Sequence, residues 1–215
     1  MRGSFRVVRL GLIVLILSAG AAALPPVRTP LLRSLGRFLV VSEQTASADA
    51  IVVAPESDVA GLIEAADLSA GGVSKRVAIF ADRVQPADVE LRRRGIVFND
   101  VTSESVRILH ALGVADIEKI PARAGGTEQE TGELVEWCRM KGIRSVVVVS
   151  SADHTRRLRR VLRRSFGDPQ VAVTVRAARY SLFDPEHWWA TRDGARLGIV
   201  ETEKLMLDLL RHPLG

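Results

Sequence analysis

Short apolar runs alternate with amphipathic stretches along most of this chain. The clearest run is residues 146–149, four valines bounded by Ser145 on one side and Ser150-Ser151 on the other. A fully apolar, β-branched run of this length predicts a strand buried on both faces, as in the interior of a parallel sheet. The arginine-rich segment after it has Leu158, Val161 and Leu162 at helical spacing, so we predict a strand, a tight turn and a helix.

The same alternation recurs from residue 48 to the end of the chain. We predict strands over residues 50–54, 76–80, 117–120, 146–149 and 171–175. We predict helices over residues 57–68, 86–94, 103–112, 127–141, 155–166 and 192–211. Strands that alternate with helices of these lengths indicate an α/β domain, a Rossmann-like three-layer fold with a mostly parallel sheet.

The first 47 residues have a different pattern. Arg2, Arg6 and Arg9 precede an uncharged run of 15 residues that ends before Pro25-Pro26. We expect residues 1–24 to be a membrane anchor, an N-terminal membrane helix; a cleaved secretory signal and a buried helix are the alternatives. In the first two cases residues 48–215 lie outside the cytoplasmic membrane, or are secreted. Residues 25–47 are expected to form a short linker over 25–30 and an amphipathic helix that lies on the membrane or packs on the domain.

Polar residues follow two of the predicted strands. In open α/β sheets, ligands bind outside the carboxyl ends of strands, where helix N-termini offer free N–H groups to anions. Ser150, Ser151, His154 and Arg157 occupy such a position, and His154 and Arg157 share one helix face. We predict that Ser150, Ser151 and Arg157 bind an anion and that His154 transfers a proton.

A second candidate stretch lies between the third strand and the next helix. Gly126 frees the backbone, and Thr127 with Glu130 has the spacing of a capping box. One interpretation is capping alone. The other, which we carry forward, is that Gly126 and Thr127 bind the ligand and Glu130 is catalytic.

Composition narrows the choice of partners. The net charge is +5 and the pI about 10.1, yet no nucleic-acid-binding motif or aromatic platform accompanies the charge. We therefore expect a small anionic molecule or a lipid-linked glycan as ligand, and a membrane as partner, but no nucleic acid. Cys138, the one cysteine, is expected to be buried, and the dispersed histidines indicate no metal site. The sequence identifies no cofactor and no oligomeric state.

Two C-terminal stretches complete the candidate chemistry. The Asp184-Pro185 pair is expected to begin a helix, with Trp188 and Trp189 holding this loop on the sheet. Glu201 and Lys204 are three residues apart on the last predicted helix, either near the strand ends or as a surface ion pair.

These stretches together resemble the YdcF/SanA/ElyC-like envelope proteins, also known as domain of unknown function 218. The resemblance covers roughly residues 31–210 and is carried by residues 48–53, 126–130, 150–157, 183–189 and Glu201 with Lys204. It implies an N-terminal membrane segment and a Rossmann-like domain. It also implies a role in cell-envelope or peptidoglycan biogenesis, and one cytoplasmic member of the family is linked to S-adenosylmethionine binding.

One turn departs from the family pattern. The first strand of the family usually ends in a glycine-rich turn, where this chain has Ala54-Pro55-Glu56. Proline lacks the N–H that would bind an anion, so part of the ancestral site is expected to have changed. We expect the exported domain to bind, and to process, an anionic cell-wall or polyprenyl-phosphate-linked precursor, as a hydrolase or transferase. The alternatives are a non-catalytic envelope interaction module and an S-adenosylmethionine- or nucleotide-binding enzyme.

Overall fold

Five parallel strands form the centre of the protein. The structure is a computed structural model that describes residues 24–81, 85–96, 100–122, 125–167 and 171–213. The strands are β1 (Ala50–Val53), β2 (Arg76–Phe80), β3 (Asp116–Ile120), β4 (Ser145–Ser150) and β5 (Ala172–Ala177). They lie in the order β3-β2-β1-β4-β5, and every neighbouring pair is parallel. The predicted Rossmann-like α/β sheet is confirmed.

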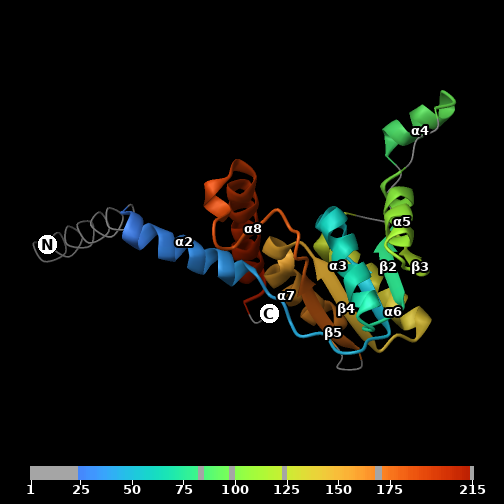
Figure 1. The fold of residues 1–215 in the computed structure, drawn as a ribbon, viewed down its shortest axis with the longest axis horizontal. Helices are drawn as coiled ribbons and strands as arrows, with labels where there is room; N and C mark the ends of the chain where they lie inside the picture. Colours follow the sequence, from blue (N-terminus) through green and yellow to red (C-terminus); the bar gives the residue numbers. More distant parts are fainter. Residues whose placement is uncertain (1–23, 82–84, 97–99, 123–124, 168–170, 214–215) are drawn as a thin grey trace, which may run out of the picture.

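The central strands β1 and β4 are buried along most of their length, as their apolar sequences predict. Ile51 lies opposite Val147 and Val53 opposite Val149 in the ladder. Because side chains alternate across a strand, each strand supplies two separate cores. Ile51 and Val53 pack toward α3 (Asp58–Ala70) and α5 (Val101–Ala111), whereas Val148 packs toward α6 (Thr127–Lys141) and α7 (Thr155–Phe166). The result is a helix–sheet–helix sandwich (Figure 1).

A third apolar cluster joins the first and last helices of the described chain. It lies between α2 (Pro25–Leu39), the short helix η3 (Trp188–Ala190) and α8 (Arg192–Arg211). The Trp188 indole donates a hydrogen bond to the Leu32 carbonyl oxygen at 2.8 Å, and its ring lies against Gly198. Trp188 therefore holds α2 and α8 together, in an apolar cluster that also includes Ala177 of β5.

The beginning of the described chain also departs from the expectation. The predicted linker over residues 25–30 is wrong, because α2 already begins at Pro25. Prolines are tolerated in the first turn of a helix, where the missing N–H has no partner to lose. The predicted anchor over residues 1–24 lies outside the described residues except for Leu24. None of the described helices is long and apolar enough to span a membrane.

Residues after α2 lead into the domain along the edge of the sheet. The backbone N–H of Glu43 donates to the Val175 carbonyl oxygen at 2.9 Å, and the Glu43 carboxylate accepts from the Val175 N–H at 2.9 Å. Leu39 is fully buried. The end of the lead-in helix thus packs on the domain, which was one of the two predicted alternatives, while much of its other side stays exposed. The short helix α4 (Pro86–Arg93) has no buried residue.

Candidate ligand-binding cleft

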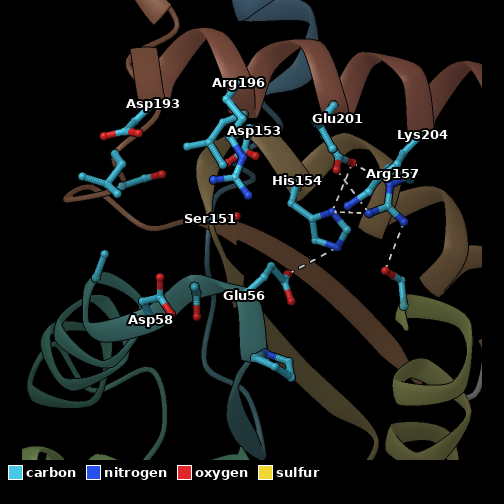
Figure 2. Close-up of a pocket in the computed structure, with 18 of the residues that line it drawn as sticks. Glu56, Asp58, Ser151, Asp153, His154, Arg157, Asp193, Arg196, Glu201 and Lys204 are labelled. Carbon is cyan, nitrogen blue, oxygen red and sulfur yellow. Dashed lines mark hydrogen bonds and ion pairs between the residues drawn. The ribbon is translucent and has the colours of Figure 1, made fainter. Parts of the chain in front are cut away.

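A cleft opens at the point where the strand order reverses. From β1 the chain runs outward through β2 to β3, then returns to place β4 on the other side of β1. Crevices at the carboxyl ends of two such strands are where open α/β sheets bind ligands. Here the cleft has a volume of about 920 Å³. The short helix η1 (Pro55–Ser57) after β1, the N-terminus of α6, the start of α7 and one side of α8 form its walls (Figure 2).

His154 is held on both ring nitrogens by carboxylates. It ends the 3₁₀ turn η2 (Ala152–His154) after β4, and only 4% of its surface is exposed. Nδ1 lies 3.1 Å from the Glu201 carboxylate on α8, and Nε2 lies 3.3 Å from the Glu56 carboxylate on η1. Burial alone would lower the pKa of His154, but Glu56 and Glu201 outweigh it and raise the pKa above its usual value. A protonated His154 can donate to both carboxylates, whereas the Arg157 guanidinium, with a terminal nitrogen 2.9 Å from Nδ1, acts against the protonated form.

Arg157 fixes the position of Glu201 at the buried end of the cleft. Its Nε donates to Glu201 at 2.6 Å and one terminal nitrogen donates to the same carboxylate at 3.2 Å. The other terminal nitrogen donates to the Thr127 hydroxyl at 3.0 Å. Glu201 is only 4% exposed; burial alone would raise its pKa, but hydrogen bonds from His154 and Arg157 lower it. Arg157 thus keeps Glu201 ionised and joins the start of α6 to α7 and α8.

The turn after β1 contributes a carboxylate to the cleft. Pro55 starts η1, and Glu56 then faces the cleft. Ser150, at the end of β4 and fully buried, donates from its hydroxyl to Glu56 at 2.7 Å. Ser150 thereby positions Glu56, and the turn builds part of the cleft.

The N-terminus of α6 is arranged differently from the predicted capping box. The helix begins at Thr127, so Gly126 occupies the cap position with a φ of 109°, which favours glycine. The Gly126 N–H donates to the Glu130 carboxylate at 3.3 Å, four residues on. Burial and the nearby Glu56 raise the pKa of Glu130. Thr127 is thereby free to accept from Arg157, and the raised pKa makes the Glu130 carboxylate a stronger base than an ordinary glutamate.

Asp153 has an unpartnered oxygen beneath the cleft. It lines the cleft and is 6% exposed, and its Oδ1 has no hydrogen-bond partner within the described part of the protein. Buried unpaired acceptors are rare, because they lose their water without a replacement. Burial, together with the Glu201 charge, raises the pKa of Asp153. This oxygen is itself buried, so it lies beneath the cleft surface and not on it.

Two cations on α8 face the cleft without a carboxylate. Arg196 and Lys204 line it, and neither forms an ion pair with any described residue (Figure 2). Arg196 and Lys204 are eight residues apart on α8, which separates their backbone positions by about 12 Å along the helix axis. The carboxylates that line the cleft are Glu56, Asp58, Glu130, Asp153, Asp193 and Glu201. The cleft therefore offers two free cations together with several acceptors for hydroxyl or amide groups.

Most of the predicted site residues come together in this cleft. Those that line it are Gly126, Thr127, Glu130, Ser151, His154 and Arg157. Ser150 does not reach the cleft surface. The helices α6 and α7 follow β3 and β4, which are not neighbours in the sheet, because β2 and β1 lie between them. Their N-terminal ends meet through the Arg157–Thr127 hydrogen bond.

Two carboxylates of the cleft have roles that differ from, or were left open by, the sequence-based expectation. Glu56 lies in the turn that was expected to have changed, yet it contacts His154. Glu201 lies near the strand ends, which was one of the two predicted alternatives, and not in a surface ion pair with Lys204. Asp184 does not begin a helix; it accepts from the Glu186 N–H at 2.8 Å in a turn before η3.

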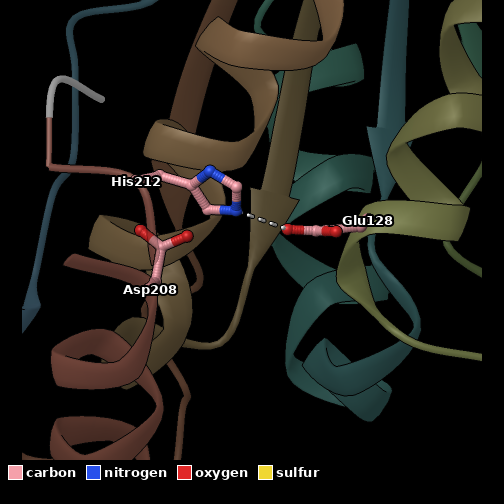
Figure 3. A group of neighbouring side chains, drawn as sticks. All are labelled: Glu128, Asp208 and His212. Atoms are coloured by element: carbon pink, nitrogen blue, oxygen red, sulfur yellow. Dashed lines mark ion pairs between the residues drawn. The ribbon is translucent and has the colours of Figure 1, made fainter. Parts of the chain in front are cut away.

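One group with metal-ligand geometry lies outside the cleft. Among the described residues, Glu128, Asp208 and His212 have ligand atoms within 4.8 Å of one another (Figure 3). Asp208, however, accepts from Arg160 at 2.7 Å and from Arg164 at 2.6 Å. A cation here would have to displace two arginines, so we assign this group to the packing of α7 on α8.

Comparison with known proteins adds little to this geometry. No protein-family model matches the sequence, and no curated protein matches it either. Among solved structures, the reductase domain of the aureusimine biosynthetic cluster is similar at 14% identity and a TM-score of 0.23. The match covers 57% of this chain and 40% of that one. A likeness this distant carries no argument about function.

Proposed function

We propose that the cleft between β1 and β4 binds a phosphorylated ligand that also carries hydroxyl or amide groups. The observation that carries this proposal is that Arg196 and Lys204, two cations without carboxylate partners among the described residues, line one cleft together with His154. Arginine and lysine are the usual side chains for phosphate recognition. Arg157 is a positioning residue, because Glu201 and Thr127 occupy its guanidinium.

The carboxylates fit the rest of such a ligand. The Glu130 carboxyl lines the cleft and can exchange hydrogen bonds with sugar hydroxyls or amides. The charge of Glu201 is already balanced by Arg157, so it does not repel an anion at full strength. A phosphorylated glycan combines both chemistries. We include in the proposal that the ligand is a cell-wall or polyprenyl-phosphate-linked precursor and that the domain acts at the cell envelope. This part rests on the resemblance to the YdcF/SanA/ElyC-like proteins.

If the ligand is hydrolysed, Glu130 and His154 are the residues that would transfer the two protons. The oxygen of water attacks phosphorus and loses a proton to Glu130, while the bond from phosphorus to the leaving oxygen breaks. Nε2 of His154 faces the cleft and donates its proton to that leaving oxygen, so His154 acts as the general acid. Glu201 stabilises the imidazolium before transfer and orients its ring.

The proposal is tested by calorimetry, which measures the binding of inorganic pyrophosphate and of undecaprenyl phosphate to the full chain. Losing a charged hydrogen bond costs about 1.5–3 kcal/mol, so Arg196→Gln and Lys204→Gln should each weaken binding roughly 10-fold or more. The matched control is Lys75→Gln, since Lys75 is an exposed cation away from the cleft. Equal affinity in all three variants would remove the proposal.

Two other outcomes would identify the rival functions. Binding of S-adenosylmethionine in competition with pyrophosphate would favour a cofactor-dependent enzyme. Binding of none of these molecules would favour an interaction module.

A further inference from the structure

A second, smaller groove lies away from the cleft, where α2, α7 and α8 meet. Its volume is about 200 Å³. Its polar lining consists of four arginines of α7: Arg156, Arg159, Arg160 and Arg163. Its apolar lining consists of Phe38 of α2, Val41 just after α2, and Leu205 and Leu209 of α8. We call this the arginine groove. Positions three, four and seven apart on a helix share one face, which is why the sequence of α7 gathers these charges.

Two of the four arginines have carboxylate partners and two do not. Arg159 pairs with Glu43, and Arg160 with Asp208 at 2.7 Å. Arg156 instead donates to the Phe38 carbonyl oxygen and lies over the Phe38 ring, 4.2 Å from its centre. Arg163 is exposed and has no ion-pair partner within the described residues. The groove therefore keeps two uncompensated positive charges beside an apolar floor.

An exposed apolar row on α2 continues from this groove. Its members are Val27, Leu31 and Phe38, with Leu24 just before the helix; all are exposed and spaced so that they share one face. The adjacent face packs on the domain through Leu32, Leu35 and Leu39. In the sequence, the row continues the uncharged apolar run of residues 10–24. Cations beside an exposed apolar helix face are the combination that binds to an anionic lipid surface.

We propose that the arginine groove binds the head groups of anionic phospholipids while the apolar row on α2 enters the interfacial layer of the membrane. This inference does not depend on the ligand of the cleft. Its consequence is that the domain lies against the membrane with α2 flat on the surface. A negatively charged lipid would supply the partners that Arg156 and Arg163 lack.

Co-sedimentation of the full chain with phosphatidylcholine vesicles, with or without phosphatidylglycerol, tests the proposal. The double variant Arg156→Gln/Arg163→Gln should bind the anionic vesicles roughly 30-fold more weakly than the natural chain, as expected for two lost cations near such a surface. Binding to neutral vesicles should not change. The control Arg139→Gln/Arg144→Gln removes the same charge from exposed positions near the start of β4 and should bind as the natural chain does.

A fluorophore in the arginine groove reports lipid contact at the groove itself, whereas co-sedimentation also detects any lipid binding by residues 1–23. Burial raises the pKa of the Cys138 thiol to about 12, so a cysteine introduced by Leu209→Cys can be labelled selectively. The emission of this label should shift to shorter wavelength when anionic vesicles are added. The shift should be absent when the label is placed in the double variant Arg156→Gln/Arg163→Gln. A label at Val89→Cys, exposed on α4, should not respond.

Three results would overturn the proposal. The first is equal weakening by the control pair, which would mean that net charge alone matters. The second is unchanged lipid binding and emission in the glutamine variant. The third is reversal of the anionic-vesicle effect by inorganic phosphate at constant ionic strength, which would indicate a soluble anion instead. If the double variant unfolds, Arg163→Gln alone, at an exposed residue without a partner, should still weaken binding about 5-fold.

Discussion

Glu201→Gln removes the charge that the buried end of the cleft depends on. In the natural protein this carboxylate accepts from Arg157 at 2.6 and 3.2 Å and contacts His154 at 3.1 Å, with 4% of the residue exposed. Breaking a buried ion pair costs about 3–5 kcal/mol. Glutamine keeps one acceptor oxygen, so we expect the lower end, about 3 kcal/mol. For a chain of this size that loss corresponds to a fall in melting temperature of roughly 6–12 °C.

The same substitution should change how His154 titrates. Because Glu201 and Glu56 raise the pKa of His154 in the folded state, the stability that protonated His154 contributes is fully present below its unfolded pKa. It is lost as the pH rises through the folded pKa. Glu201→Gln removes one of the two carboxylates, so the pKa of His154 should fall and the loss of stability should move to lower pH.

Histidine side-chain NMR as a function of pH measures this directly, with the His154 signal assigned from His154→Gln. The control is Glu203→Gln, an exposed residue on the same helix whose loss should change neither the pKa of His154 nor the melting temperature. A His154 pKa in Glu201→Gln equal to or above that of the natural protein would refute the reasoning.

Three further predictions concern packing. Gly198→Ala should destabilise the protein by about 1–3 kcal/mol in thermal unfolding, because a Cβ there would lie 2.5 Å from the Trp188 ring. Gly132→Ala, in an open position of α6, should be neutral or stabilising, and equal effects would contradict this packing. Asp208→Asn should lower the melting temperature by more than Asp116→Asn does, since only Asp208 holds two arginines closely; equal shifts would contradict its structural role. Cys138 should resist thiol reagents at mildly alkaline pH until the protein unfolds, because burial raises its pKa to about 12; rapid native modification would show that it is accessible.

The fold could be predicted from the sequence because its signals are local. The valine run of β4 is apolar on both faces because helices cover both faces of the sheet. The turn after β4 was recognised as a site by its position at a strand end, and His154 does lie in the cleft. Such features need only the periodicity of the strand or helix that contains them.

The carboxylates of the cleft depend on contacts that periodicity does not encode. Glu56 meets His154 because β1 and β4 are neighbours, although they are far apart in the sequence. Glu201 is four residues from both Leu197 and Leu205, so helical spacing places it on the inward face of α8. Which residue it meets there depends on how α8 folds over the start of α7, and spacing does not encode that. The Thr127 hydroxyl was expected either to cap its own helix or to bind the ligand, but it accepts from Arg157 on another helix.

Recognition of a phosphorylated ligand in the cleft is tested most directly at His154 itself. The measurement is the NMR signal of its imidazole nitrogens while inorganic pyrophosphate is added to the full chain at constant pH. Because an anion beside Nε2 stabilises the imidazolium, we predict a saturable shift of this signal and a rise in the pKa of His154, both weakened by Arg196→Gln. An unchanged His154 signal at concentrations where calorimetry detects binding would place the anion elsewhere and contradict the account.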